Sequence, residues 1–92
     1  MLAPEQARAA RAWLQWTQAE FARRAKVGLS TVKDFESGTR SPITNNLNAM
    51  QQALEAAGVQ LVFEGEKAAG ITVDDARRVV RAPSAASDAN AP

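Results

Sequence analysis

The stretch TQAEFARRAKVGLSTVKDFESGTRSP, residues 17–42, decides the fold of this chain. It begins with T-x-x-E, a capping box in which the Thr17 side chain accepts from the amide of Glu20 and the Glu20 carboxylate reaches back to the amide of Thr17. A helix is therefore predicted over residues 18–25. Its small or apolar inward positions are Phe21, Ala22 and Ala25.

A second helix is predicted over residues 29–36. Gly28 suits an N-cap and Gly38 suits a C-terminal stop. Val32 and Phe35 fall inward at helical spacing. The two helices and the short turn between them therefore form a helix-turn-helix, which needs a small residue at the crossing and a second helix with an open outer face.

The outer face of this second helix carries mostly polar side chains. They are Leu29, Ser30, Lys33 and Asp34, with Thr31 at the flank. Two interpretations remain open from the residues alone: an ordinary solvated helix face, or a surface that recognises another molecule.

Two more helices are predicted around this motif. Pro4 suits the first turn of a helix over residues 4–15. A further helix over residues 44–57 is ended by Gly58, and its apolar stripe is Leu47, Met50 and Leu54. The expected fold is mainly α, with four helices followed by a short β element.

Residues 14–42 resemble the Xre/Cro-type helix-turn-helix regulators, the group that includes the lambdoid phage repressors. With the flanking helices, the resemblance extends over residues 4–58. The matching residues are Gln18, Ala22, Val27, Val32, Phe35, Glu36, Gly38, Arg40 and Pro42. The resemblance implies a bacterial or phage-like, lambda-repressor-like domain that binds the major groove of double-stranded DNA. It also implies a homodimer on an inverted-repeat operator, acting as a repressor or autoregulator.

The resemblance also implies roles for individual residues. The base-edge readers are Leu29, Ser30, Thr31, Lys33 and Asp34. The contacts to the DNA backbone are Thr17, Gln18, Lys26, Thr39, Arg40 and Asn45. One departure stands out, because the family usually places Gly where this chain has Lys26, and a lysine at positive φ costs about 1 kcal/mol or more.

The pattern of residue types changes after residue 58. VQLVF at 59–63 is β-branched and aromatic, and predicts a strand. Residues 65–70 are expected to form a turn or loop. Residues 71–73 can form a return strand, or TVDDARRVV at 72–80 can form a short helix capped by Thr72. The Ala/Ser/Pro-rich residues 82–92 are expected to be disordered.

The strand needs a partner strand, because the unpaired N–H and C=O groups along a free edge pair readily with other chains. It can form a hairpin with Ile71–Val73 or pair with a second copy, and we favour both together. The expected dimerisation residues are Val59, Leu61, Val62 and Phe63. The alternative is a monomer whose hairpin folds over the helix at 44–57. The expected units are a DNA-binding domain at 1–58, an extension at 59–81 and a tail at 82–92.

The amino-acid composition excludes several kinds of functional site. The 92 residues include no Cys, His or Tyr, which excludes disulfides, zinc–thiolate sites and a catalytic thiol. No phosphate-binding loop or paired carboxylates are evident, so we expect no enzyme, metal or cofactor. The longest apolar runs are too short to cross a membrane, and the N-terminus lacks a secretion signal, so a cytoplasmic location is expected.

The charge is unevenly distributed. Residues 1–42 hold seven Lys/Arg and four acids, or +3, whereas the remainder holds four bases and six acids, or −2. The N-terminal half is therefore the better candidate for contacting the phosphate groups of a nucleic acid. Two other functions remain open: an antitoxin that binds a toxin through its tail, and an accessory factor that contacts RNA polymerase or another regulator.

Both tryptophans and Glu36 are expected to have structural roles. Trp13 and Trp16 are either a stacking platform for bases or core residues, and we favour one closing the core with the other half-buried beside it. Glu36 is expected to have a structural role, capping or pairing near Arg40.

Overall fold

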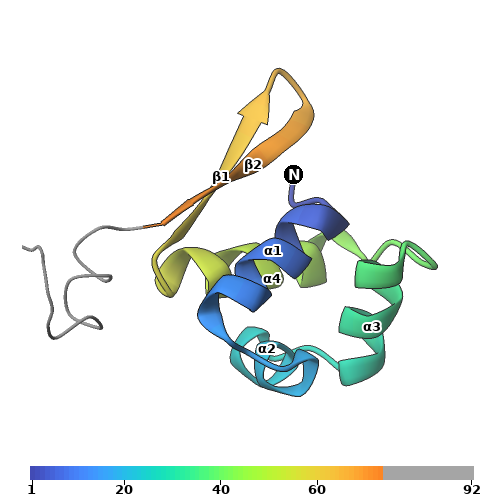
Figure 1. The fold of residues 1–92 in the computed structure, drawn as a ribbon. Coiled ribbons are helices and arrows are strands. Elements are labelled where there is room, and N and C mark those ends of the chain that lie inside the picture. The colour runs from blue at the N-terminus through green and yellow to red at the C-terminus, as the bar shows by residue number, and fades with distance from the viewer. Residues whose placement is uncertain (74–92) are drawn as a thin grey trace, which may run out of the picture.

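The computed structural model describes residues 1–73, which form four helices and a C-terminal β-hairpin (Figure 1). The mainly helical fold predicted from the sequence is therefore confirmed. Each helix boundary lies within one residue of its predicted position. The elements are α1 (Pro4–Leu14), α2 (Gln18–Ala25), α3 (Leu29–Ser37), α4 (Thr44–Ala56), β1 (Val59–Glu64) and β2 (Lys67–Val73).

The second strand is longer than expected. Residues 71–73 are strand, as in the first of the two alternatives, and they pair antiparallel with the start of β1. The expectation of a loop over 65–70 is wrong, because β2 already begins at Lys67 and leaves a two-residue turn at Gly65 and Glu66. Gly65 has φ 65°, a conformation that favours glycine and permits this tight connection. The expectations for residues 74–81 and 82–92 lie outside the described residues.

The capping box at residues 17–20 is half formed. Thr17 Oγ1 accepts from the amide of Glu20 at 3.0 Å, as predicted. The Glu20 carboxylate does not return to Thr17, because it binds Arg23 and Arg24 at 2.7 and 2.6 Å. The reciprocal bond appears at α1 instead, where the amide of Ala3 donates to Gln6 Oε1 at 3.0 Å.

The core lies between the four helices and the base of the hairpin. Its largest fully buried side chains are Phe21, Met50, Leu54, Val32 and Val59. Trp16 is buried in this core with its ring centroid 6.1 Å from that of Phe21, whereas Trp13 is partly exposed. Trp16 therefore closes the core, as predicted for one of the two tryptophans, whereas the expectation that the other is half-buried is wrong because Trp13 is 38% exposed. Because Leu61 and Ile71 also pack on the core, the hairpin base belongs to the same packed unit as the helices.

A β-bulge interrupts the hairpin, and Gln6 fills the interruption. Val62 pairs with Gly70 and Phe63 with Ala68, which leaves Ala69 as the extra residue on β2. Gln6 is buried, and its Nε2 donates to the carbonyls of Val62 and Gly70 at 3.0 Å each. One side chain of α1 therefore holds both strands to the helical domain.

No helix within residues 1–73 is long and apolar enough to cross a membrane.

We predict that Gln6→Ala loosens the hairpin more than the helices. The substitution removes two hydrogen bonds to strand carbonyls and one to the amide of Ala3, and each such hydrogen bond contributes about 0.5–1.5 kcal/mol of stability. Amide hydrogen exchange should show β1 and β2 losing protection before α2 and α4. The exposed Gln52→Ala on α4 is the control and should leave the exchange pattern unchanged. Equal loss of protection in helices and hairpin after Gln6→Ala would contradict the assignment.

Candidate nucleic-acid interface

The turn between α2 and α3 contains a lysine in a left-handed conformation. Lys26 has φ 59° and ψ 43°, so it occupies the geometry that glycine would favour at the C-terminus of a helix. The amide of Val27 donates to the carbonyl of Ala22 at 3.1 Å and closes the turn. The departure at Lys26 therefore changes the residue but keeps a left-handed turn.

The N-terminus of α3 lies directly after this turn. Gly28 is its N-cap, as predicted, and its carbonyl accepts from the amides of Thr31 and Val32 at 3.1 and 3.3 Å. Val32 and Phe35 are buried against the other helices, whereas Leu29 is 40% exposed. Burial of one side of α3 leaves the opposite side open to a ligand.

The predicted base-edge residues share this open side of α3. Ser30 and Lys33 are exposed, and Thr31 and Asp34 are half-buried. Ser30, Thr31 and Asp34 also line a cleft of about 220 Å³. The far wall of the cleft is formed by Arg40, Ser41, Pro42, Ile43 and Asn46. The fold therefore brings three of the predicted base readers beside one of the predicted backbone contacts.

The loop after α3 is fixed by backbone hydrogen bonds to a single residue. The carbonyl of Asp34 accepts from the amides of Thr39 and Arg40 at 2.9 and 3.2 Å. The Thr39 hydroxyl lies 2.7 Å from that of Ser37. These bonds place the exposed Arg40 at the edge of the cleft. Sequence reasoning missed Ser41 and Asn46 as cleft residues and named Asn45, the exposed residue that precedes Asn46 on α4.

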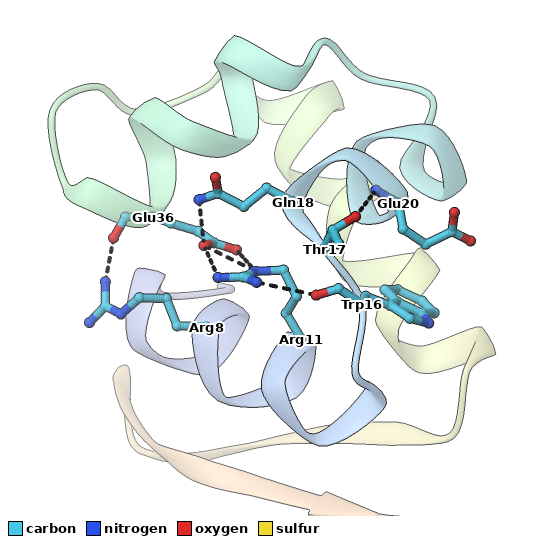
Figure 2. Close-up of polar contacts among 7 residues, drawn as sticks. All are labelled: Arg8, Arg11, Trp16, Thr17, Gln18, Glu20 and Glu36. Carbon is cyan, nitrogen blue, oxygen red and sulfur yellow. Dashed lines mark hydrogen bonds and ion pairs between the residues drawn. The ribbon is translucent and has the colours of Figure 1, made fainter.

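A buried ion pair joins α1 to α3 (Figure 2). Glu36 is 3% exposed, and its carboxylate accepts from Arg11 Nε at 2.9 Å and from Arg11 Nη2 at 3.0 Å. The second Nη of Arg11 donates to the carbonyl of Trp16 at 3.2 Å. The structural role predicted for Glu36 is present, but its partner is Arg11 rather than Arg40. Arg8 adds a hydrogen bond to the Glu36 carbonyl near the end of α3.

Gln18 takes part in the same network from the first turn of α2. Its Nε2 donates to Glu36 Oε1 at 3.1 Å, as Figure 2 shows. An amide nitrogen carries two hydrogens, so one of them is used inside the protein. Gln18 therefore links α2 to α3 in addition to the backbone contact implied by the resemblance.

The paired arginines of α2 are engaged with an acid on their own helix. Arg23 and Arg24 both bind Glu20, and their hydrogen bonds lower the pKa of Glu20 to about 2. The same contact raises the pKa of Arg23. The Arg24 guanidinium also lies 4.6 Å from the centroid of the Trp16 ring, a cation–π arrangement. These contacts fit a compensated surface rather than a clamp for phosphate.

The remaining predicted backbone residues surround this surface at separate points. Thr17 is exposed at the start of α2, and Lys26 is exposed at its end. Thr39, Arg40 and Asn45 lie on the far side of α3, in the loop and in the first turn of α4. The exposed predicted residues thus extend from the ends of α2, across the outer side of α3, to the start of α4.

Comparison with known proteins identifies this part of the chain. The model of a family described as helix-turn-helix matches residues 8–58, a span that contains α2, α3, α4 and most of α1. No curated protein matches the chain significantly.

We predict that Arg11→Met destabilises the fold strongly. The substitution leaves the buried Glu36 carboxylate without its cation. Breaking a fully buried ion pair lowers the free energy of unfolding by about 3–5 kcal/mol. Because the Arg11 side chain is 25% exposed, we expect a decrease of about 2–4 kcal/mol. Urea unfolding at neutral pH measures the change. Arg23→Met is the matched control, since Glu20 is partly exposed and keeps Arg24, and it should cause no measurable loss. Equal losses in the two variants would show that burial of the ion pair is irrelevant.

Proposed function

We propose that this chain, which belongs to the helix-turn-helix family of DNA-binding transcription regulators, reads the DNA major groove with α3. In the proposed complex it binds as a homodimer on an inverted-repeat operator. Occupation of the operator then excludes other proteins from the DNA, so the chain acts as a repressor or autoregulator.

One observation carries the proposal: α3 is buried on one side and presents hydrogen-bonding side chains on the other, directly after a tight turn. A helix of this kind fits the major groove, where each base pair displays a distinct pattern of donors and acceptors. The first residues of α3 supply much of this chemistry. In this motif the N-terminal residues of the second helix are those that contact base edges.

Each side chain of the proposed reading surface suits a particular base feature. Lys33 can donate to O6 and N7 of guanine, and Asp34 can accept from N4 of cytosine. Leu29 can contact a thymine methyl, whereas Ser30 and Thr31 can donate or accept. Asp34 is half-buried and lines the cleft together with Arg40, which we propose contacts the DNA backbone.

The proposed backbone contacts lie on both sides of α3. Thr17, Gln18 and Lys26 belong to α2 and its turn, and Thr39, Arg40 and Asn45 belong to the loop and α4. Free amides in the first turn of a helix favour phosphate, and the exposed lysine and arginine add charge. The net charge of +3 over residues 1–42 supports this side of the molecule as the one that meets DNA.

Selection of bound sequences from a random DNA pool, followed by footprinting, tests the proposal. The expected result is an enriched inverted repeat whose half-sites are about one helical turn of DNA apart. A pool that shows no enrichment after several rounds would contradict sequence-specific binding.

We predict that Lys33→Ala and Ser30→Ala change which sequences are preferred, because each lost base contact costs about 1–3 kcal/mol of discrimination. Circular dichroism should stay unchanged, since both side chains are exposed. The matched control is Arg40→Ala, which should weaken all sites about equally and reduce the slope of log affinity against log salt by about one contact. Gln18→Ala is a less clean control because it also removes a hydrogen bond to Glu36. Unaltered sequence preference in both α3 variants would refute α3 as the reading element.

We predict opposite effects of Lys26→Gly on folding and on DNA binding. Lys26 and Gln15 both have φ near 60°, and glycine at either position should stabilise the fold by about 0.5–1 kcal/mol after its own entropy is counted. Lys26→Gly should also weaken DNA binding, because it removes a proposed phosphate contact. Gln15→Gly, at the end of α1, should raise the melting temperature to a similar extent and leave DNA binding unchanged. A Lys26→Gly variant with full DNA affinity would remove Lys26 from the interface.

A further inference from the structure

The Gln18 side chain lies at the boundary between the buried ion pair and the proposed DNA surface. Gln18 is half-buried, whereas its neighbours Thr17 and Ala19 are exposed. Its Nε2 donates to Glu36 Oε1 at 3.1 Å, and Glu36 is 3% exposed. Gln18 thus belongs to the buried network and is also one of the proposed contacts to the DNA backbone.

The Glu36 carboxylate determines which end of the Gln18 amide faces it. A glutamine side chain carries an acceptor oxygen and a donor nitrogen, and either can turn toward a neighbour. A carboxylate held by a guanidinium only accepts, so it binds the nitrogen of Gln18 and not the oxygen. Figure 2 shows this arrangement, with the amide nitrogen of Gln18 toward Glu36 and its oxygen turned away. Glu36 uses one hydrogen of Nε2, which leaves the second to donate to another acceptor.

Arg11 makes this arrangement compatible with DNA. A lone carboxylate beside a phosphate contact would repel the phosphate. Arg11 donates to both oxygens of Glu36, from Nε at 2.9 Å and from Nη2 at 3.0 Å, and so compensates the charge. The carbonyl of Trp16, which accepts from Arg11 Nη1 at 3.2 Å, helps to hold the guanidinium there. The ion pair therefore contributes no net charge at the surface, and its contribution there is the orientation of one amide.

We propose that Glu36 is a positioning residue for DNA binding: it accepts one hydrogen of the Gln18 amide and thereby directs the second hydrogen at a phosphate of the DNA backbone. This role rests on the proposed function and extends it to a residue that makes no DNA contact itself. Fixing a flexible side chain before binding removes part of the ordering cost of association. A glutamine without this partner would have to be ordered, and its amide turned the right way, each time the chain binds DNA.

The same hydrogen bond connects the proposed phosphate contact to the proposed reading helix. Glu36 belongs to α3, and Gln18 is the first residue of α2. The donor for phosphate is therefore held in a fixed relation to the helix that carries the proposed base readers. A shift of α3 would move the carboxylate and, with it, the amide that contacts the DNA backbone.

An apolar replacement of the ion pair separates the positioning role from a purely structural one. Arg11→Met combined with Glu36→Leu removes both charges together, and such replacements of buried pairs are often neutral or stabilising. Urea unfolding should therefore show a stability close to that of wild type, in contrast to Arg11→Met alone. The net charge of the chain is unchanged, so the general attraction to DNA is also unchanged.

The affinity for an operator selected from a random DNA pool measures the positioning role. Gln18→Ala should weaken binding about tenfold, because a hydrogen bond to a charged phosphate is lost. The double variant should weaken binding to a similar extent although Gln18 is still present. Adding Gln18→Ala to the double variant should then change the affinity by less than about twofold, because the two changes act on the same contact.

Methylphosphonate substitution shows whether the affected contact is the one made by Gln18. Replacing single phosphates of the operator by uncharged methylphosphonates identifies the phosphate whose replacement weakens binding of wild type but not of Gln18→Ala. The double variant should be as insensitive to this replacement as Gln18→Ala is. A double variant that stays as sensitive as wild type would overturn the positioning role.

Arg40→Ala is the matched control. Arg40 is a proposed phosphate contact in the loop after α3, and its amide is held by the carbonyl of Asp34 rather than by Glu36. Arg40→Ala should weaken binding by the same factor in wild type and in the double variant. Loss of the Arg40→Ala effect in the double variant would indicate a general displacement of α3 and overturn a specific action of Glu36 through Gln18.

Side-chain NMR of the free wild-type chain tests the positioning without any substitution. The order parameter of the Gln18 side-chain amide should be close to that of the α2 backbone, whereas the exposed Gln52 on α4 should give a lower value. A mobile Gln18 amide, or an undiminished effect of Gln18→Ala in the double variant, would overturn the positioning role and leave the proposed function intact. A wild-type chain that selects no DNA would refute both.

Discussion

The rest of the structure depends on the buried carboxylate of Glu36. A charge that is 3% exposed is tolerated only when its hydrogen-bonding capacity is filled, and here Arg11 and Gln18 fill it from two other helices. Any rotation of α3 about its axis would move this carboxylate away from both partners. The electrostatic requirement at one end of α3 therefore sets which side of the helix faces solvent, and with it the positions of Ser30, Lys33 and Asp34.

Helix α1 supplies polar groups both to the proposed reading helix and to the hairpin. Arg11 and Arg8 bind Glu36 on α3, and Gln6 binds the two strands of the hairpin. The α1 helix has no proposed DNA contact of its own. Its role is to hold the proposed reading helix and the hairpin, whose first strand is expected from the sequence to support dimerisation, in one rigid relation, because both attachments are side-chain hydrogen bonds from α1. On an inverted repeat, such a relation would fix the spacing between half-sites.

The sequence was informative wherever structure depends on near neighbours. Thr17, Gly28 and Gly38 act within one helical turn, and the boundaries of all four helices followed from such signals and from apolar spacing. Long-range pairs were missed. Arg11 and Glu36 are 25 residues apart, and Gln6 is 64 residues from Gly70, so no local pattern joins them. Glu20 failed as a capping partner because two arginines on its own helix compete for the carboxylate. The bulge at Ala69 likewise has no signature in a run of small residues.

The small number of cations available to contact DNA gives a reason for binding as a homodimer. Of the seven Lys and Arg in residues 1–42, Arg11, Arg23 and Arg24 are in ion pairs and Arg8 binds a carbonyl. The hydrogen bond of Arg8 leaves its charge uncompensated, but Arg8 is not among the proposed DNA contacts, so Lys26, Lys33 and Arg40 are the proposed contacts that can neutralise phosphate or interact with bases. Because affinity depends on counterion release with a slope of about −0.9 per phosphate neutralised, three cations give one chain a weak electrostatic hold at physiological salt. Two chains joined in the proposed homodimer would double that number and make binding to the second half-site intramolecular. On this reasoning the ion pairs that stabilise the small domain reduce its affinity as a monomer, and dimerisation restores the affinity without adding charge to α3.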